Sequence, residues 1–149
     1  MNNTSLEYLG FTIGAIKIAV AVPLVQEVFE TTVVTRVPGC PDFIAGMVNV
    51  RGGIVPVLSL LAGAPDGRST AKIVVLQTAE GQVGLLVSTV VDLLRFETIA
   101  PTVILPPELA AWSTCFDAMA GHDGIYLLLN VSQLIAGTLS RTAEAIATT

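Results

Sequence analysis

Charged residues are scarce in this sequence, and the positive ones never cluster. Only 13% of the 149 residues are charged, whereas a soluble domain usually has about 25%. The formal net charge is −5, and the seven Lys and Arg residues are scattered along the chain. Because binding to a phosphate backbone requires several grouped cations, we expect neither nucleic acid nor anionic lipid as a partner.

Long apolar runs are also missing, although 52% of the residues are hydrophobic. A membrane-spanning helix needs about 20 consecutive apolar residues without charge. The best candidate, residues 11–25, contains Lys17 in its middle and Pro23 near its end, and no basic residue precedes it as a secretory signal would require. We therefore expect a soluble, cytoplasmic protein without direct membrane insertion, whose apolar residues form the core and interaction surfaces.

Residues that carry catalysis or bind metals are few. Cys40 and Cys115 have no metal-ligand or redox spacing, so both are expected to be reduced thiols. The single histidine, His122, lies in a predicted turn, where Cys115 could approach it across a hairpin as in a cysteine hydrolase. A metal site there would also need Asp117 and Asp123. No phosphate-binding glycine motif occurs, so we expect no catalytic residue, cofactor or metal.

Short β-branched runs separated by glycine-bearing turns dominate the chain. Three turns predict hairpins, at 51–53, 80–81 and 122–124. Pro56 within one run indicates an edge or a bulge nearby. Roughly nine short strands in this length indicate a barrel or sandwich. The predicted runs are 8–13, 18–22, 23–29 (one helical turn leading into a strand), 46–50, 54–58, 72–78, 82–87, 90–96, 113–120 and 125–130.

One helix is predicted near the C-terminus. Asn130 can cap its start, Gln133 stands three residues later as in a capping box, and Gly137 can end it. The residues 138–149, rich in alanine and threonine, either fray or extend this helix. The chain shows no linker, so we expect a single domain over 1–149, with a core at about 8–137 and a tail at 138–149.

The segment 37–57 is the most informative part of the sequence. It combines two stiffening prolines, an apolar plug and a glycine that permits close packing: Pro38, Pro41, Phe43, Ile44 and Gly46. A strand then delivers Asn49 and Arg51 to a turn formed by Gly52 and Gly53. An arginine on such a rigid tip can donate up to five hydrogen bonds to a partner. The spacing alone, however, favours an ordinary surface arginine.

This segment resembles the signature of CheW-like domains, the family of chemotaxis coupling proteins. The similarity extends to 25–28, 83–84, 90–94, 128–130 and 134–135, and thus covers about residues 8–135. The matching residues of the signature are Pro38, Pro41, Phe43, Ile44, Gly46, Asn49, Arg51, Gly52, Ile54, Pro56 and Val57.

The resemblance implies a mainly all-β fold of two packed five-stranded SH3-like β-barrel subdomains with a short C-terminal helix. It also implies a non-enzymatic adaptor or scaffold of a two-component chemosensory pathway. Such proteins bind the cytoplasmic tip of methyl-accepting chemoreceptors, couple it to the regulatory domain of a CheA-type histidine kinase, and join other CheW-like domains in arrays. The receptor lies in an aliphatic groove between the barrels. By matching position, the candidate contact residues are Val25, Glu27, Val28, Gly46, Asn49, Arg51 and Gly52.

The sequence departs from the family pattern after the signature strand. Where the family commonly has Val-Asp-Leu-Arg, this chain has Leu58-Ser59-Leu60-Leu61, so an acid and a cation are missing. The connection at 62–71 is also short. By analogy with the family, we expect weakened kinase binding and an intact receptor groove. Two other classes stay open: a small-ligand-binding β-barrel and, last, the Cys115/His122 hydrolase.

Overall fold

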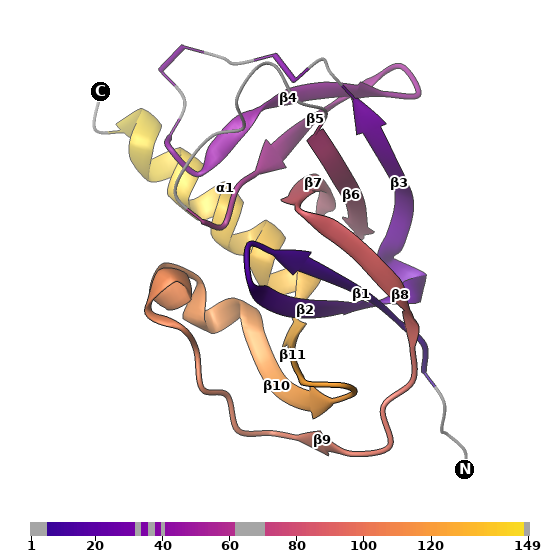
Figure 1. The fold of residues 1–149 in the computed structure, drawn as a ribbon. Helices are drawn as coiled ribbons and strands as arrows, with labels where there is room; N and C mark the ends of the chain where they lie inside the picture. Colours follow the sequence, from indigo (N-terminus) through magenta and orange to yellow (C-terminus); the bar gives the residue numbers. More distant parts are fainter. Residues whose placement is uncertain (1–5, 32–33, 36–37, 40, 62–70, 148–149) are drawn as a thin grey trace.

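The computed structural model describes residues 6–31, 34–35, 38–39, 41–61 and 71–147, and within these ranges eleven strands form two sheets (Figure 1). The two sheets face one another across an apolar interior, and one long helix packs beside them. The expected mainly all-β class is therefore confirmed.

The six-stranded sheet joins the two ends of the sequence. Its order is β8-β1-β2-β11-β10-β9, and β2 pairs with β11 in parallel while the other neighbours are antiparallel. The strands are β1 (Tyr8–Ile13), β2 (Ile16–Ala21), β8 (Thr89–Leu94), β9 (Ile99–Ala100), β10 (Phe116–Gly121) and β11 (Ile125–Leu129). Five strands were expected in each barrel. The additional strand in this sheet is β9, which has only two residues.

The five-stranded sheet comes from the middle of the chain and has the order β3-β6-β7-β5-β4. Its strands are β3 (Val25–Thr31), β4 (Ile44–Val50), β5 (Gly53–Leu58), β6 (Ala71–Thr78) and β7 (Gly81–Val87). Beyond β3, Thr35 pairs with Met47 of β4 through two backbone hydrogen bonds of 2.8 and 2.9 Å. Because β3 and β4 are the end strands of the sheet, this bridge closes it into a barrel, as expected.

The strand β6 shows how the two sheets share their interior. Val74 and Leu76 point into the large core between the sheets, whereas Ile73 and Val75 point into the interior of the five-stranded barrel. All four side chains are fully buried. A strand that is covered on both faces needs a continuous apolar run rather than an alternating one, which explains the sequence Ile-Val-Val-Leu at this place.

Helical segments fill the remaining sides of the core. A 3₁₀ turn at Val22–Leu24 precedes β3, as predicted. A 3₁₀ segment at Pro107–Cys115, kinked at Trp112, was not predicted; it begins at the second of two consecutive prolines and buries Leu109 and Trp112. The expected strand at 113–120 therefore begins only at Phe116, because the preceding residues belong to this helix.

The C-terminal helix α1 (Val131–Ala147) begins as predicted but does not end at Gly137. The Asn130 Oδ1 atom accepts a hydrogen bond of 3.0 Å from the Gln133 amide, which confirms the N-cap. Thr138 is buried, and its hydroxyl donates to the Leu134 carbonyl at 2.8 Å. A glycine inside a helix costs about 1 kcal/mol, so packing at Thr138 outweighs it. None of the described helices is long and apolar enough to cross a bilayer.

Two of the predicted hairpin turns contain a non-glycine residue with left-handed backbone. Asp123 has a φ of 49° and precedes Gly124 at 120°, and Arg51 has a φ of 52° and precedes Gly52 at 86°. Asparagine, aspartate and glycine tolerate this region best. Pro56 predicted an edge or a bulge nearby. The structure has a register shift in the neighbouring strand β4, between Ile44 and Gly46, where β4 pairs with β5.

The shared core predicts a strong effect of Leu76→Ala on stability. Leu76 is fully buried on β6, so its truncation leaves a cavity and should lower the free energy of unfolding by about 2–5 kcal/mol. Urea unfolding measures this change. The matched control is Leu93→Ala on β8, where the side chain is 53% exposed and the expected loss is about 1 kcal/mol or less. Equal losses in the two variants would contradict the assignment of the core.

Candidate functional site

Arg51 stands on a rigid turn at the end of the β4–β5 hairpin. Its backbone is in the left-handed region, with a φ of 52°, which costs a non-glycine residue about 1–2 kcal/mol. The side chain of Asn49 holds this turn, because its Oδ1 atom accepts a hydrogen bond of 3.0 Å from the Gly52 amide. The Arg51 side chain is 76% exposed. The turn therefore displays the guanidinium to partners.

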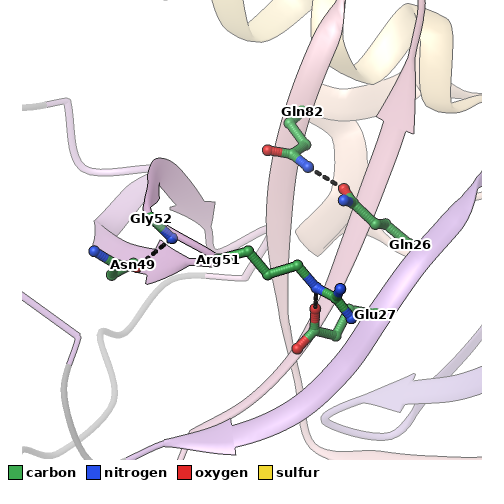
Figure 2. Close-up of polar contacts among 6 residues, drawn as sticks. All are labelled: Gln26, Glu27, Asn49, Arg51, Gly52 and Gln82. Atoms are coloured by element: carbon green, nitrogen blue, oxygen red, sulfur yellow. Dashed lines mark hydrogen bonds and ion pairs between the residues drawn. The ribbon is translucent and has the colours of Figure 1, made fainter.

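Glu27 of β3 fixes the direction of this guanidinium (Figure 2). The Nε atom of Arg51 donates to Oε1 of Glu27 at 3.0 Å. Since β3 and the β4–β5 hairpin lie at opposite ends of the strand order, the ion pair spans the seam of the closed barrel. A solvent-exposed pair of this kind contributes only about 0–1 kcal/mol to stability, so its main effect is on orientation.

A second polar pair stands next to this one in the chain. The amide of Gln82 on β7 donates to the Oε1 atom of Gln26, the residue before Glu27 (Figure 2). Neither glutamine was among the candidates, because no local sequence pattern pairs residues 56 positions apart. We call the six residues drawn in Figure 2 the Arg51 cluster: Gln26, Glu27, Asn49, Arg51, Gly52 and Gln82.

Val28 lies on the opposite face of β3 from Glu27. Glu27 pairs with Val75, whose side chain enters the barrel interior, and Val28 pairs with Val74, whose side chain enters the core between the sheets. Successive side chains of a strand point to opposite faces. The Arg51 cluster therefore lies on one face of β3, and Val28 lies on the other.

Val28 borders a hollow where the two sheets meet. Val28 is 42% exposed there, and the hollow has a volume of about 470 Å³. Val25, near the start of the same strand, is partly buried against the core between the sheets. The residues that line this inter-sheet hollow come from β3, β6 and β8, and they are Val28, Phe29, Glu30, Lys72 and Val90.

Gly46 takes a structural position within the candidate set. It is buried on β4, and a Cβ atom built on it would lie 2.6 Å from the carbonyl oxygen of Thr35. Thr35 is the residue that closes the barrel by pairing with Met47. Gly46 therefore permits closure and does not itself offer a surface to a partner.

The proposed cysteine–histidine pair does not form. Cys115 is buried at the end of the 3₁₀ helix, and His122 is exposed in the turn beyond β10. The six residues of β10 separate them, a span of about 20 Å at the usual rise of a strand. Asp117 is hydrogen-bonded to the Asn130 amide at 2.9 Å. The described part of the chain contains no group of three potential metal ligands, and Cys40 lies outside the described residues.

A second hollow bears on the alternative of a ligand-binding barrel. It has a volume of about 440 Å³ and is bordered by Ile104 and Ile125, which are 74% and 64% exposed. Among the described residues that line it, one is charged: Lys17, whose ammonium group donates to the Asp123 carbonyl at 2.5 Å. Small-molecule sites use several convergent polar groups to orient a ligand, and the lining side chains do not provide such a set.

Barrel closure at Gly46 predicts that Gly46→Ala is destabilising. The added methyl group meets a backbone atom rather than a flexible side chain, so the expected loss is about 1–3 kcal/mol in the free energy of unfolding. Urea unfolding provides the measurement. Gly53→Ala in the same hairpin is the control, because its nearest neighbour lies at an ordinary 3.5 Å. If both variants are equally stable, Gly46 has no role in closure.

Comparison with known proteins supports this view of the fold. The chain matches the CheW-like domain over residues 7–138. It is 33% identical over 116 residues to a probable chemotaxis protein CheW of Rhizobium etli, covering 74% of this chain and 73% of that protein. It is 36% identical over 110 residues to the chemotaxis protein CheW of Klebsiella aerogenes, covering 70% and 64%. The crystal structure of the scaffolding protein TtCheW from Thermoanaerobacter tengcongensis is similar, with a TM-score of 0.71, 21% identity and coverage of 85% and 89%.

Proposed function

The chain belongs to the CheW-like domain family, and on this premise we propose that it is a non-enzymatic adaptor of chemosensory signalling. It binds the cytoplasmic tip of a methyl-accepting chemoreceptor in the cytoplasm and links that tip to a CheA-type histidine kinase and to other CheW-like domains. The observation that carries the proposal is the exposed Arg51 guanidinium, held at 3.0 Å by Glu27, with the inter-sheet hollow on the opposite face of the same strand.

The geometry suits a helical partner with one apolar stripe. Side chains of such a stripe can pack against Val28 and Val90 at the inter-sheet hollow. A carboxylate or carbonyl on the flank of the helix can then accept hydrogen bonds from Arg51, because Glu27 engages only the Nε atom in the described ion pair and the guanidinium has four further N–H donors. Since the two surfaces lie on opposite faces of β3, the partner must contact residues on both faces of this strand.

We propose that kinase binding is weak because of the residues at the end of β5 and directly after it, 58–61. Leu58 and Leu60 are buried in the core, whereas Ser59 and Leu61 are only partly buried. Ser59 and Leu61 are the two positions where the family commonly has an acid and a cation. The departure thus removes two charges from the accessible side of this segment. The short connection at 62–70 lies outside the described residues.

The receptor proposal predicts that Arg51→Ala weakens binding to an isolated chemoreceptor tip by about tenfold or more, since truncation of an interface arginine often costs more than 1 kcal/mol. The free energy of unfolding should change by about 1 kcal/mol or less. Calorimetric titration and urea unfolding give the two values. Arg95→Ala is the matched control, because Arg95 is also exposed and also lies near a glutamate, Glu7, at 3.8 Å. Unchanged affinity in Arg51→Ala contradicts the proposed site.

The kinase proposal predicts unequal retention in a pull-down experiment. The wild-type chain should retain the isolated receptor tip well and the isolated kinase regulatory domain poorly. The double substitution Ser59→Asp and Leu61→Arg restores both charges of the family pattern and should increase retention of the kinase domain. Receptor retention by the double variant serves as the control and should stay constant. Equal retention of both partners by the wild-type chain refutes the weakened kinase contact.

A further inference from the structure

Arg51 needs an external restraint to hold one direction. An arginine side chain carries about 2 kcal/mol of rotamer entropy, and this one is 76% exposed on the tip of a hairpin. The restraint in the structure is the carboxylate of Glu27, 3.0 Å from the Nε atom. Whatever changes the position of that carboxylate therefore also changes where the guanidinium points.

Glu27 follows an irregularity in an end strand of the sheet. In the order β3-β6-β7-β5-β4, β6 is the one described strand to which β3 is hydrogen-bonded. The pairing runs from Val25 opposite Leu76 directly to Glu27 opposite Val75, so Gln26 is an extra residue in a β-bulge. Bulges bend a strand and re-aim the side chains next to them. The direction of the Glu27 carboxylate thus depends on the conformation of Gln26.

Gln82 restrains this bulge from the middle of the sheet. It lies on β7, the central strand, and its side-chain amide reaches past β6 to donate to the Oε1 atom of Gln26 (Figure 2). The bond ties the bulge residue to a strand that is paired on both sides. Figure 2 shows the bond between Gln82 and Gln26 and the bond between Glu27 and Arg51. Gln26 and Glu27 are neighbours in the chain, so the backbone of β3 links the two bonds.

We propose that Gln82 is a positioning residue that sets the direction of Arg51 through Gln26 and Glu27. The proposal deepens the receptor-binding function and rests on it for its consequence in binding. When the Gln82 bond is lost, the bulge has more than one conformation, and Arg51 spends less time in the direction that fits a partner. The apparent affinity falls by the same factor as the population of the competent state.

The first test concerns the free protein and needs no partner. In a ¹H–¹⁵N spectrum of the full chain, the Nε–H signal of Arg51 is identified by its loss in Arg51→Ala. In Gln82→Ala we expect this signal to move toward that of a solvated arginine and to exchange faster with water. Gln77→Ala is the matched control, because Gln77 lies directly opposite Gln82 in the β6–β7 pairing and is exposed. An unchanged signal in Gln82→Ala overturns the proposal.

The second test measures binding of the full chain to an isolated chemoreceptor tip. Gln82→Ala and Gln26→Ala should each weaken binding by about three- to tenfold, and Gln77→Ala should leave it unchanged. In an Arg51→Ala background, Gln82→Ala should cause no further loss, because its effect passes through Arg51. An additional loss of the same size in that background means that Gln82 acts independently, and this overturns the proposal.

The two tests separate this inference from the proposed function. If the wild-type chain does not bind the tip while the Arg51 signal responds to Gln82→Ala, the receptor function fails and the positioning role stands. If the wild-type chain binds and Arg51→Ala weakens binding while Gln82→Ala changes neither signal nor affinity, the positioning role fails and the receptor function stands.

Discussion

Closure of the five-stranded sheet is the constraint on which the candidate site depends. The end strands β3 and β4 come together because Thr35 pairs with Met47, and Gly46 leaves room for that approach. Only in the closed arrangement can Glu27 of β3 reach Arg51 beyond β4. The pair contributes little stability by itself, since it is exposed. Its geometry is a consequence of backbone pairing and of the core that supports both strands.

The strand β3 separates two kinds of surface. Side chains on one face contribute to the charged and amide groups of the Arg51 cluster, and those on the other face contribute to the border of the inter-sheet hollow. A partner that engages both faces must match charge and shape at once, which supports selectivity. Side chains of a regular strand alternate between its two faces. The β-bulge at Gln26 interrupts this alternation at Gln26 and Glu27.

Local patterns in the sequence predicted the features that depend on neighbouring residues. The hairpin turns, the N-cap at Asn130 and the helical turn before β3 all follow from contacts within a few positions. Of the two outcomes left open for residues 138–149, the structure shows extension of α1, because burial of Thr138 overrides the preference of Gly137. The partner of Arg51 lies 24 positions away and that of Gln82 lies 56 positions away. No spacing rule covers such distances. The strand order brings Gln82 near Gln26, and the contact of Arg51 with Glu27 also needs the closed sheet.

The parallel pairing of β2 with β11 has a consequence for biosynthesis. It joins Ile18 to Leu127, so the six-stranded sheet cannot be assembled until most of the chain has left the ribosome. The strands of the five-stranded sheet are instead contiguous in the sequence, from Val25 to Val87. During translation this middle portion has all its strands available first. The N-terminal hairpin of β1 and β2 therefore keeps an apolar face uncovered until β10, β11 and the final helix have been synthesised.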